Sequence, residues 1–175
     1  LLVIDIGGGS LEMAVGVDES PEVAISLPLG AARLTNKFLK GDPYTDKSIR
    51  SLRDHIEERL EQILPNLVKH QESDRAIATS KTLRTLARLT GDWFDGNGKN
   101  ITADAIRKLS AKLSEMDNSE RAKLPGVSEN RASQIVAGAF VAESVMRNLD
   151  IAELEICPWA LREGVVLKWL DWMEA

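Results

Sequence analysis

The sequence predicts an α/β fold in which a three-stranded antiparallel meander is extended by further strands and flanked by helices. The chain opens with three short apolar or alternating segments that are joined by tight turns, and amphipathic segments then alternate with short apolar ones. Its 175 residues, 43% of them hydrophobic, are enough to bury one core without disulfides or a structural metal. We therefore expect residues 1–175 to form a single domain.

The strands are predicted from their hydrophobic patterns. Residues 1–6 form an apolar run broken only by Asp5, which is typical of a central strand that is covered on both faces. Residues 11–17 alternate between large apolar side chains and polar or small ones, as a half-buried strand does. The remaining predicted strands are residues 23–29, 74–79 and 154–157.

The helices are predicted from apolar positions that recur every three or four residues. The longest such segment is 46–70, and Thr102 is a suitable N-cap for a helix over 103–116. Glycines and asparagines predict a loop over 91–100. The other predicted helices are residues 31–39, 81–89, 128–148 and 161–173.

Composition narrows the classes of function. A net charge of −5, without a long basic run, argues against duplex nucleic acid or an anionic membrane as the partner. The longest apolar run, residues 135–142, is too short to span a bilayer. The single Cys157 excludes an internal disulfide and a cysteine zinc site, and it favours a reducing, cytoplasmic location. His55 and His70 lie 15 residues apart on one predicted helix and share no face, so they do not form a metal pair.

The most informative stretch runs from Asp5 through Ile6 and Gly7, Gly8 and Gly9 to Ser10. Such glycines let backbone amides converge on an anion, because no Cβ keeps the ligand away and positive φ is available. An aspartate at the mouth of the preceding strand can hold Mg²⁺ or another divalent cation. Neither a Walker loop nor the dinucleotide fingerprint fits, since both run into a helix and position 12 is Glu. A glycine-rich hairpin of this kind is how actin, Hsp70 and sugar kinases grip phosphates; an ordinary tight hairpin is the alternative.

Three further groups are candidates for the same site. Glu12 points to the same side of its strand as Ser10, where it would position a metal or an attacking water, or else lie in solvent. Arg33 could direct its guanidinium fork at phosphate oxygens. Hydroxyls, free amides and a lysine at a helix start would make a second anion site, with plain N-capping as the alternative. The residues of that site are Thr79, Ser80, Lys81 and Thr82.

Four blocks of the sequence resemble the exopolyphosphatase and guanosine pentaphosphate phosphohydrolase (Ppx/GppA) family. They are residues 5–12 (Asp-Ile-Gly-Gly-Gly-Ser-Leu-Glu), 27–35 (Leu-Pro-Leu-Gly-Ala-Ala-Arg-Leu-Thr), 78–82 (Ala-Thr-Ser-Lys-Thr) and 161–164 (Leu-Arg-Glu-Gly). The blocks occur in the order of the family and span nearly the whole chain. The resemblance implies a ribonuclease-H-like domain of the actin, Hsp70 and sugar-kinase superfamily. It would be the second domain of a two-domain enzyme, and we expect the first domain to precede this chain, which begins inside a predicted strand.

The resemblance also implies a reaction and its groups. The parent protein would hydrolyse the terminal phosphoanhydride of inorganic polyphosphate, or remove the 5′ phosphate of pppGpp, with Mg²⁺ or another divalent cation. Asp5 and Glu12 would hold the metal, Glu12 would help orient the water, and the general base would be a glutamate of the missing domain. Phosphate would be bound by Gly7, Gly8, Gly9, Ser10, Arg33, Thr79, Ser80, Lys81 and Thr82. The implied partners are polyphosphate or pppGpp and the missing N-terminal domain, and a homodimer stays open.

Two departures from the family keep other functions open. Many members have glycines where this chain has Ala78 and Lys81, and side chains there would narrow the approach of an anion to the backbone. They are the support for a sensor that binds polyphosphate or a nucleotide without turnover. A sugar or acetate kinase is a third alternative, and the block at residues 161–164 argues against it.

Overall fold

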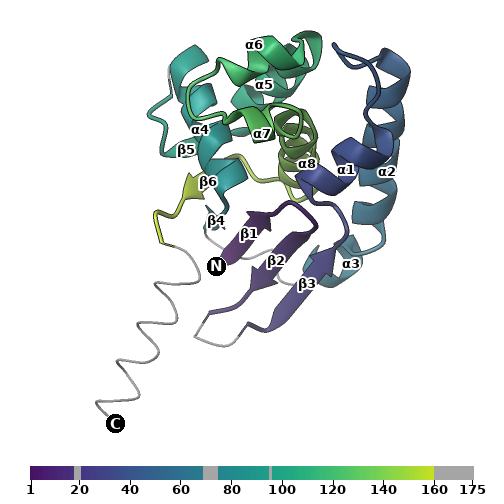
Figure 1. Ribbon diagram of the computed structural model, residues 1–175. Coiled ribbons are helices and arrows are strands. Elements are labelled where there is room, and N and C mark those ends of the chain that lie inside the picture. The colour runs from purple at the N-terminus through teal and green to yellow at the C-terminus, as the bar shows by residue number, and fades with distance from the viewer. Residues whose placement is uncertain (18–20, 69–74, 95, 160–175) are drawn as a thin grey trace, which may run out of the picture.

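The computed structural model describes residues 1–17, 21–68, 75–94 and 96–159. Within them a mixed six-stranded sheet has the strand order β3-β2-β1-β4-β6-β5 (Figure 1). The predicted strand 74–79 is thus described from residue 75 on, whereas the predicted helix 161–173 and His70 lie outside the described residues. The strands are β1 Leu2–Ile6, β2 Leu11–Val15, β3 Val23–Leu27, β4 Ala76–Ala78, β5 Asn100–Thr102 and β6 Glu153–Ile156.

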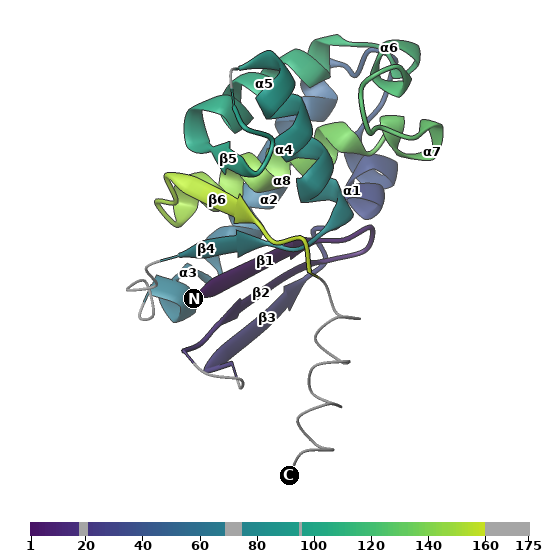
Figure 2. The same ribbon diagram turned by 90° about the vertical axis from the view of Figure 1, so that its left-hand side faces the viewer.

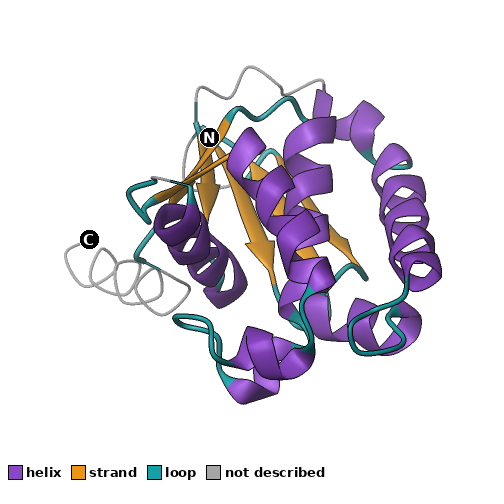
Figure 3. Ribbon diagram, turned by 90° about the horizontal axis from the view of Figure 1, so that it is seen from above, coloured by secondary structure: helices purple, strands orange, loops and turns teal. Residues whose placement is uncertain are grey.

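The predicted antiparallel meander is confirmed and forms one half of the sheet. β1 pairs with β2 so that Ile4 lies opposite Met13, and β2 pairs with β3 so that Met13 lies opposite Ile25. One face of β1 and β2 is buried, because alternate large apolar side chains point into the core. Figures 1 and 3 show the helices gathered on that side of the meander. The other face carries Asp5 and Glu12 and is more open.

The second half of the sheet consists of β4, β6 and β5, and the first two of these run parallel to β1. β1 pairs in parallel with β4, and β4 with β6, so that Ile4, Ala78 and Ile156 lie side by side. Parallel neighbours end at the same edge of a sheet, which brings the segments after β1 and β4 together. This arrangement of a meander extended by parallel strands confirms the predicted α/β fold.

The helices enclose a core around α8. This helix is buried over nearly its whole length, and it packs against α1, α2, α4 and α5. A Cβ on Gly138 would stand 2.6 Å from Cγ2 of Thr82, so the small residues of α8 let the start of α4 come close. The helices are α1 Ala31–Phe38, α2 Asp46–Glu61, α3 Leu64–Val68, α4 Lys81–Trp93, α5 Ala103–Glu115, α6 Asn118–Ala122, α7 Glu129–Ala132 and α8 Ile135–Asn148.

The structure corrects the predicted helix over 46–70. α2 ends at Glu61 and α3 begins at Leu64. Pro65 explains the break, because it has no amide hydrogen to donate to the carbonyl of Glu61 in a continuous helix.

The predicted helix over 128–148 is also divided, into α7 and α8, at Ser133 and Gln134. Side-chain donors occupy the carbonyls of Ala132 and Ser133 at this point. These carbonyls would otherwise accept bonds from amides one turn further on.

The predicted loop over 91–100 is too long at both ends. α4 continues to Trp93, and Asn100 begins β5, which pairs antiparallel with β6.

α6 was not predicted, although the capping box between Asp117 and Glu120 marks its start. Within the described ranges, no helix has both the length and the apolar character needed to cross a bilayer.

Candidate functional site

A cavity of about 280 Å³ lies where β1 and β4 end. Figure 2 shows this end of the sheet, where the β1–β2 hairpin approaches α1. Three segments that are far apart in the sequence form most of the cavity lining: the glycine turn (residues 7–10), the turn between β4 and α4 with the first turns of α4, and the segment from Gly126 to the start of α8. Gly7 and Gly8 are the residues of the glycine turn that line the cavity, and Ala31 at the start of α1 lines it as well. Gly9 and Ser10 are not among the lining residues. The first two segments are the loops that the sequence predicted as phosphate sites.

Asp5 and Thr79 join the first two walls. Asp5 is the penultimate residue of β1, and Thr79 directly follows β4. The Thr79 hydroxyl donates a hydrogen bond of 2.9 Å to Oδ2 of Asp5, and the Thr79 amide donates to the carbonyl of Ile4 at 3.1 Å. The parallel pairing of β1 and β4 therefore places a carboxylate and the β4–α4 turn on the same cavity.

The glycine turn is held by the start of α1. The amide of Gly7 donates to the carbonyl of Ser10 at 2.9 Å and closes the turn. The carbonyls of Gly7 and Gly8 accept hydrogen bonds from the amides of Ala31, at 2.9 Å, and Arg33, at 3.0 Å. These bonds direct the carbonyls of the turn toward α1.

The hydrogen bonds to the segment 31–33 also orient the amides of the glycine turn. In a planar trans peptide the N–H of one residue points opposite to the carbonyl of the residue before it. The carbonyls of Gly7, Gly8 and Gly9 are all bonded by the segment 31–33, so the amides of Gly8, Gly9 and Ser10 point away from α1. Among the described residues none of these three amides has an acceptor. Three such amides can converge on an anion.

The three glycines of the turn do not adopt left-handed backbone conformations. None of Gly7, Gly8 and Gly9 has a positive φ, so the predicted use of left-handed conformations is wrong. A Cβ on Gly9 would meet nothing within 4 Å, and one on Gly8 would touch only the Cβ of Ala32, at 3.8 Å. The folded turn therefore has room for a methyl group at either position.

Arg33 supports the loop and does not line the cavity. Its Nε donates a 2.8 Å hydrogen bond to the carbonyl of Gly9. The side chain belongs to the first turn of α1, directly against the glycine turn, and this position explains its use there. Its predicted contact with phosphate stays a prediction, whereas its contact with the loop is seen.

All four predicted residues of the second loop line the cavity, but two of their hydroxyls have other partners. Ser80 caps α4, because its Oγ accepts a hydrogen bond of 3.1 Å from the amide of Leu83. Thr79 donates to Asp5, as described above. Thr82 packs against α8, and the exposed Lys81 brings a positive charge to the wall.

Glu12 lies on the open face of the meander, outside the cavity. It is the cross-strand neighbour of Asp5, so the two carboxylates share one face of the sheet. The Ser26 hydroxyl donates to Oε1 of Glu12 at 3.3 Å. Asp5 and Glu12 together line a second, shallow hollow of about 260 Å³ on this face. Asp5 therefore stands between the cavity and Glu12.

Asp5 and Glu12 supply two carboxylates, which are fewer ligands than a metal site built from protein side chains alone requires. Within the described part of the chain, no three Asp, Glu, His or Cys side chains are grouped to hold a metal. His55 is on α2, where its ring lies 4.6 Å from that of Phe38, away from the cavity. A pair of carboxylates fits Mg²⁺ that takes its other ligands from substrate phosphates and water.

The third wall was not predicted. It contributes Arg131 from α7 and Gln134 before α8, and α4 adds Arg84. Lys81, Arg84 and Arg131 are the three cationic groups of the cavity lining, and Asp5 is its single carboxylate. Among the residues described, none of the three cations has an ion-pair partner. The spacing of Lys81 and Arg84, one helical turn apart, was a signal for α4. Arg131 had none, because its place depends on the break between α7 and α8. The charge of the cavity favours an anion.

The Ppx/GppA phosphatase family matches residues 1–173 of this chain. Exopolyphosphatase 1 of Mycobacterium leprae is 49% identical over 175 residues, and Exopolyphosphatase 1 of Mycobacterium tuberculosis is 50% identical. These matches cover 98% of this chain, and 52% and 51% of the two relatives. The chain thus spans about half the length of the curated relatives it matches.

A crystal structure shows the same fold. It is that of the Aquifex aeolicus member of the Ppx/GppA family, which superposes with a TM-score of 0.85 at 27% identity. The superposition covers 99% of this chain and 57% of the Aquifex chain. The fold is therefore the ribonuclease-H-like fold of the actin-like ATPase superfamily, as the sequence predicted.

Proposed function

This chain belongs to the Ppx/GppA phosphatase family, and from that premise we propose that its parent protein hydrolyses the terminal phosphoanhydride bond of inorganic polyphosphate. The chain supplies one wall of the phosphate site. Two relatives, 49% and 50% identical in sequence, are named exopolyphosphatase, which supports polyphosphate over pppGpp as the substrate.

The observation that carries the proposal is a cavity with three cationic side chains next to the glycine turn. Gly8 lines this cavity together with Lys81, Arg84 and Arg131, and the amides of Gly8, Gly9 and Ser10 have no acceptor among the described residues. Phosphoryl transfer involves little covalent chemistry by the protein, and it depends on positioning and on stabilising charge at the phosphate oxygens. Fixed amides and cations of this kind supply both.

We propose Asp5 and Glu12 as the carboxylates that hold a divalent cation, Mg²⁺ by preference. The fit rests on their cross-strand pairing on one open face. When bound, the cation would neutralise charge on the phosphate oxygens. The hydroxyl of Thr79 donates to Asp5, and Glu12, which accepts from Ser26, would orient a water.

The remaining catalytic groups are proposed to come from the rest of the parent protein. The general base would be a glutamate of a preceding domain that closes over the open face of the meander. We propose the cytoplasm as the location, in keeping with the single free Cys157.

The sensor alternative loses part of its support. Ala78 is fully buried in β4 and does not line the cavity, so its methyl group does not narrow the approach to the glycine turn. Lys81 does line the cavity and adds a charge that suits an anion. Neither residue then argues against turnover.

The test is phosphate release by the full-length protein from long-chain polyphosphate and, separately, from pppGpp, with Mg²⁺ and with EDTA. We expect release from polyphosphate that EDTA stops. Faster release from pppGpp would replace polyphosphate by the nucleotide. Tight binding without release from either would favour the sensor.

A second measurement locates the base. Residues 1–175 alone, with excess Mg²⁺, should release no measurable phosphate from polyphosphate, since the base lies outside them. Robust release that is lost on Glu12→Gln would instead place the general base in this chain.

A further inference from the structure

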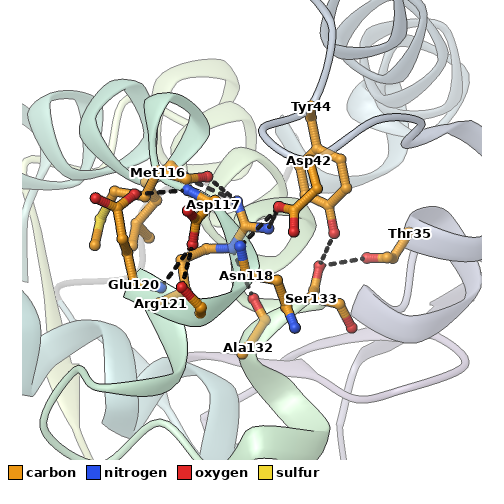
Figure 4. Close-up of polar contacts among 12 residues, drawn as sticks. Thr35, Asp42, Tyr44, Met116, Asp117, Asn118, Glu120, Arg121, Ala132 and Ser133 are labelled. Atoms are coloured by element: carbon orange, nitrogen blue, oxygen red, sulfur yellow. Dashed lines mark hydrogen bonds and ion pairs between the residues drawn. The ribbon is translucent and has the colours of Figure 1, made fainter.

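A fully buried arginine, Arg121, is not among the residues that line the cavity. Its Nε donates a 3.0 Å hydrogen bond to the carbonyl of Ala132, and its Nη1 donates to the carbonyl of Met116 at 2.5 Å. Its Nη2 lies 3.4 Å from Oδ1 of Asp42. Figure 4 shows these contacts converging on one guanidinium. A buried charge is tolerated only with such partners, so the arginine fixes the segments that it joins.

Tyr44 packs against Arg121, and together with Asp42 the two form what we call the arginine cluster. Its ring centre is 4.6 Å from the Arg121 guanidinium carbon, and its hydroxyl donates a 2.7 Å hydrogen bond to the carbonyl of Ser133. The Thr35 hydroxyl lies 3.4 Å from the same carbonyl (Figure 4), while its shorter hydrogen bond, of 2.8 Å, goes to the carbonyl of Ala31. Burial raises the pKa of Tyr44, Arg121 opposes that rise and Asp42 adds to it, with a net upward shift. The hydroxyl therefore remains protonated, as a donor must be, throughout the neutral pH range.

The two anchored carbonyls mark the break between α7 and α8. Arg121 occupies the carbonyl of Ala132, and Tyr44 occupies that of Ser133. The residue before this pair is Arg131 and the residue after it is Gln134, and both line the phosphate cavity. The cluster is thus fastened to the backbone between the two cavity residues.

We infer that Arg121 and Tyr44 are positioning residues that set the placement of Arg131 and Gln134 in the phosphate cavity. The inference rests on the proposed function only in taking the cavity to be the phosphate site. Neither positioning residue touches the substrate; both act through the backbone of Ala132 and Ser133.

Tyr44→Phe is the mildest test, because it removes one hydroxyl and keeps the ring over Arg121. If Arg131 binds phosphate equally in the ground state and the transition state, its displacement raises KM and leaves kcat nearly unchanged. In the full-length protein we expect KM for inorganic triphosphate to rise about three- to tenfold, the range set by one lost hydrogen bond. Ser110→Ala is the matched control, since it removes a buried hydroxyl that contacts Glu143, between α5 and α8, and should leave KM unchanged.

A mutant cycle separates positioning from general loosening of the fold. Tyr44→Phe should have little further effect on KM once Arg131→Ala and Gln134→Ala are both present, because the two residues through which it acts are gone. An additive effect of Tyr44→Phe in that background, or an unchanged KM in Tyr44→Phe alone, would overturn the inference. Arg121→Lys, which keeps the charge but loses the fork, should raise KM as well, and a wild-type KM in that variant would also contradict it.

The same cycle measured as the Kd of inorganic triphosphate, by calorimetry without turnover, keeps the two hypotheses apart. An inactive wild-type protein that binds triphosphate and gives a non-additive cycle would reject the proposed hydrolysis and retain the positioning role. A wild-type protein that hydrolyses polyphosphate but gives an additive cycle would do the reverse.

Discussion

Gly30→Ala is expected to destabilise the protein through a steric clash with the glycine turn. Gly30 is the N-cap of α1, with φ −73° and ψ 148°, a conformation that any residue adopts. Its requirement for glycine is therefore purely one of space. An added Cβ would lie 2.3 Å from the carbonyl carbon of Gly9 and from the amide nitrogen of Ser10. Both are backbone atoms, which cannot rotate away as a side chain can.

The size of the effect follows from the shift that the clash demands. An ordinary contact is at least about 3.4 Å, so the backbone of Gly9 and Ser10 would have to move by about 1 Å relative to α1. That shift would strain the three bonds between the turn and the segment 31–33. Overpacking with partial loss of these bonds costs about 2–4 kcal/mol in the free energy of unfolding. We expect the Tm to fall by about 4–16 °C.

Gly9→Ala is the matched control for this prediction. The new Cβ would meet nothing within 4 Å, and φ of Gly9 is not left-handed, so the fold should tolerate it. The Tm should stay the same or rise slightly, while kcat/KM for polyphosphate should fall by about tenfold or more, because a phosphate held at the amides of this turn would have less room beside a methyl group. Thermal unfolding and phosphate release by the full-length variants measure both effects. A wild-type Tm in Gly30→Ala, or an equal loss of Tm in Gly9→Ala, would refute the steric reasoning.

Three further predictions concern single side chains. Asp5→Asn should keep the hydrogen bond from Thr79 and the fold, yet lower Mg²⁺-dependent phosphate release by about two orders of magnitude or more, whereas Asp104→Asn, an exposed control, should not. Burial raises the pKa of Glu57, but hydrogen bonds from Asn148 and Ser144, together with Arg147, outweigh it and hold the pKa below its usual 4.5. The Tm advantage of the wild type over Glu57→Gln should therefore be complete at pH 7 and disappear as the pH falls below about 4.5; an advantage that grows in acid would contradict this. His55→Gln should leave the kinetics unchanged, since its ring lies against Phe38 on α2, and a changed kcat would show a link to the site that the structure does not suggest.

The sequence was informative where local chemistry decides the structure. The meander could be predicted because alternation and tight turns are local signals, and the pairing of β1 with β2 needs only the turn between them. The two loops were assigned to one phosphate site, but the contact of Asp5 with Thr79 depends on the parallel pairing of β1 with β4, which was not predicted. β5 could not be predicted, because its three residues pair with β6, more than 50 residues away.

The roles of individual polar residues could be predicted less well than the loops that contain them. Arg33 and Ser80 have the right chemistry for phosphate, but the structure uses Arg33 to bind the carbonyl of Gly9 and Ser80 to cap α4. A motif limits which groups are present and does not say which backbone atoms compete for them. Arg131 shows the opposite case, because its contribution depends on contacts with Arg121 and Tyr44 that no local pattern reveals.

The position of Asp5 explains why we expect a second domain to complete the phosphate site. On one side Asp5 borders the cavity of amides and cations, and on the other it shares the open face of the meander with Glu12. A phosphate held at the amides of Gly8 to Ser10 would be gripped from the helix side, where the described chain places its cations. The water and its base must then approach from the side that the described residues leave open. For that reason we place Glu12 beside the metal and the water, and we expect the proton acceptor on the part of the parent protein that covers this face.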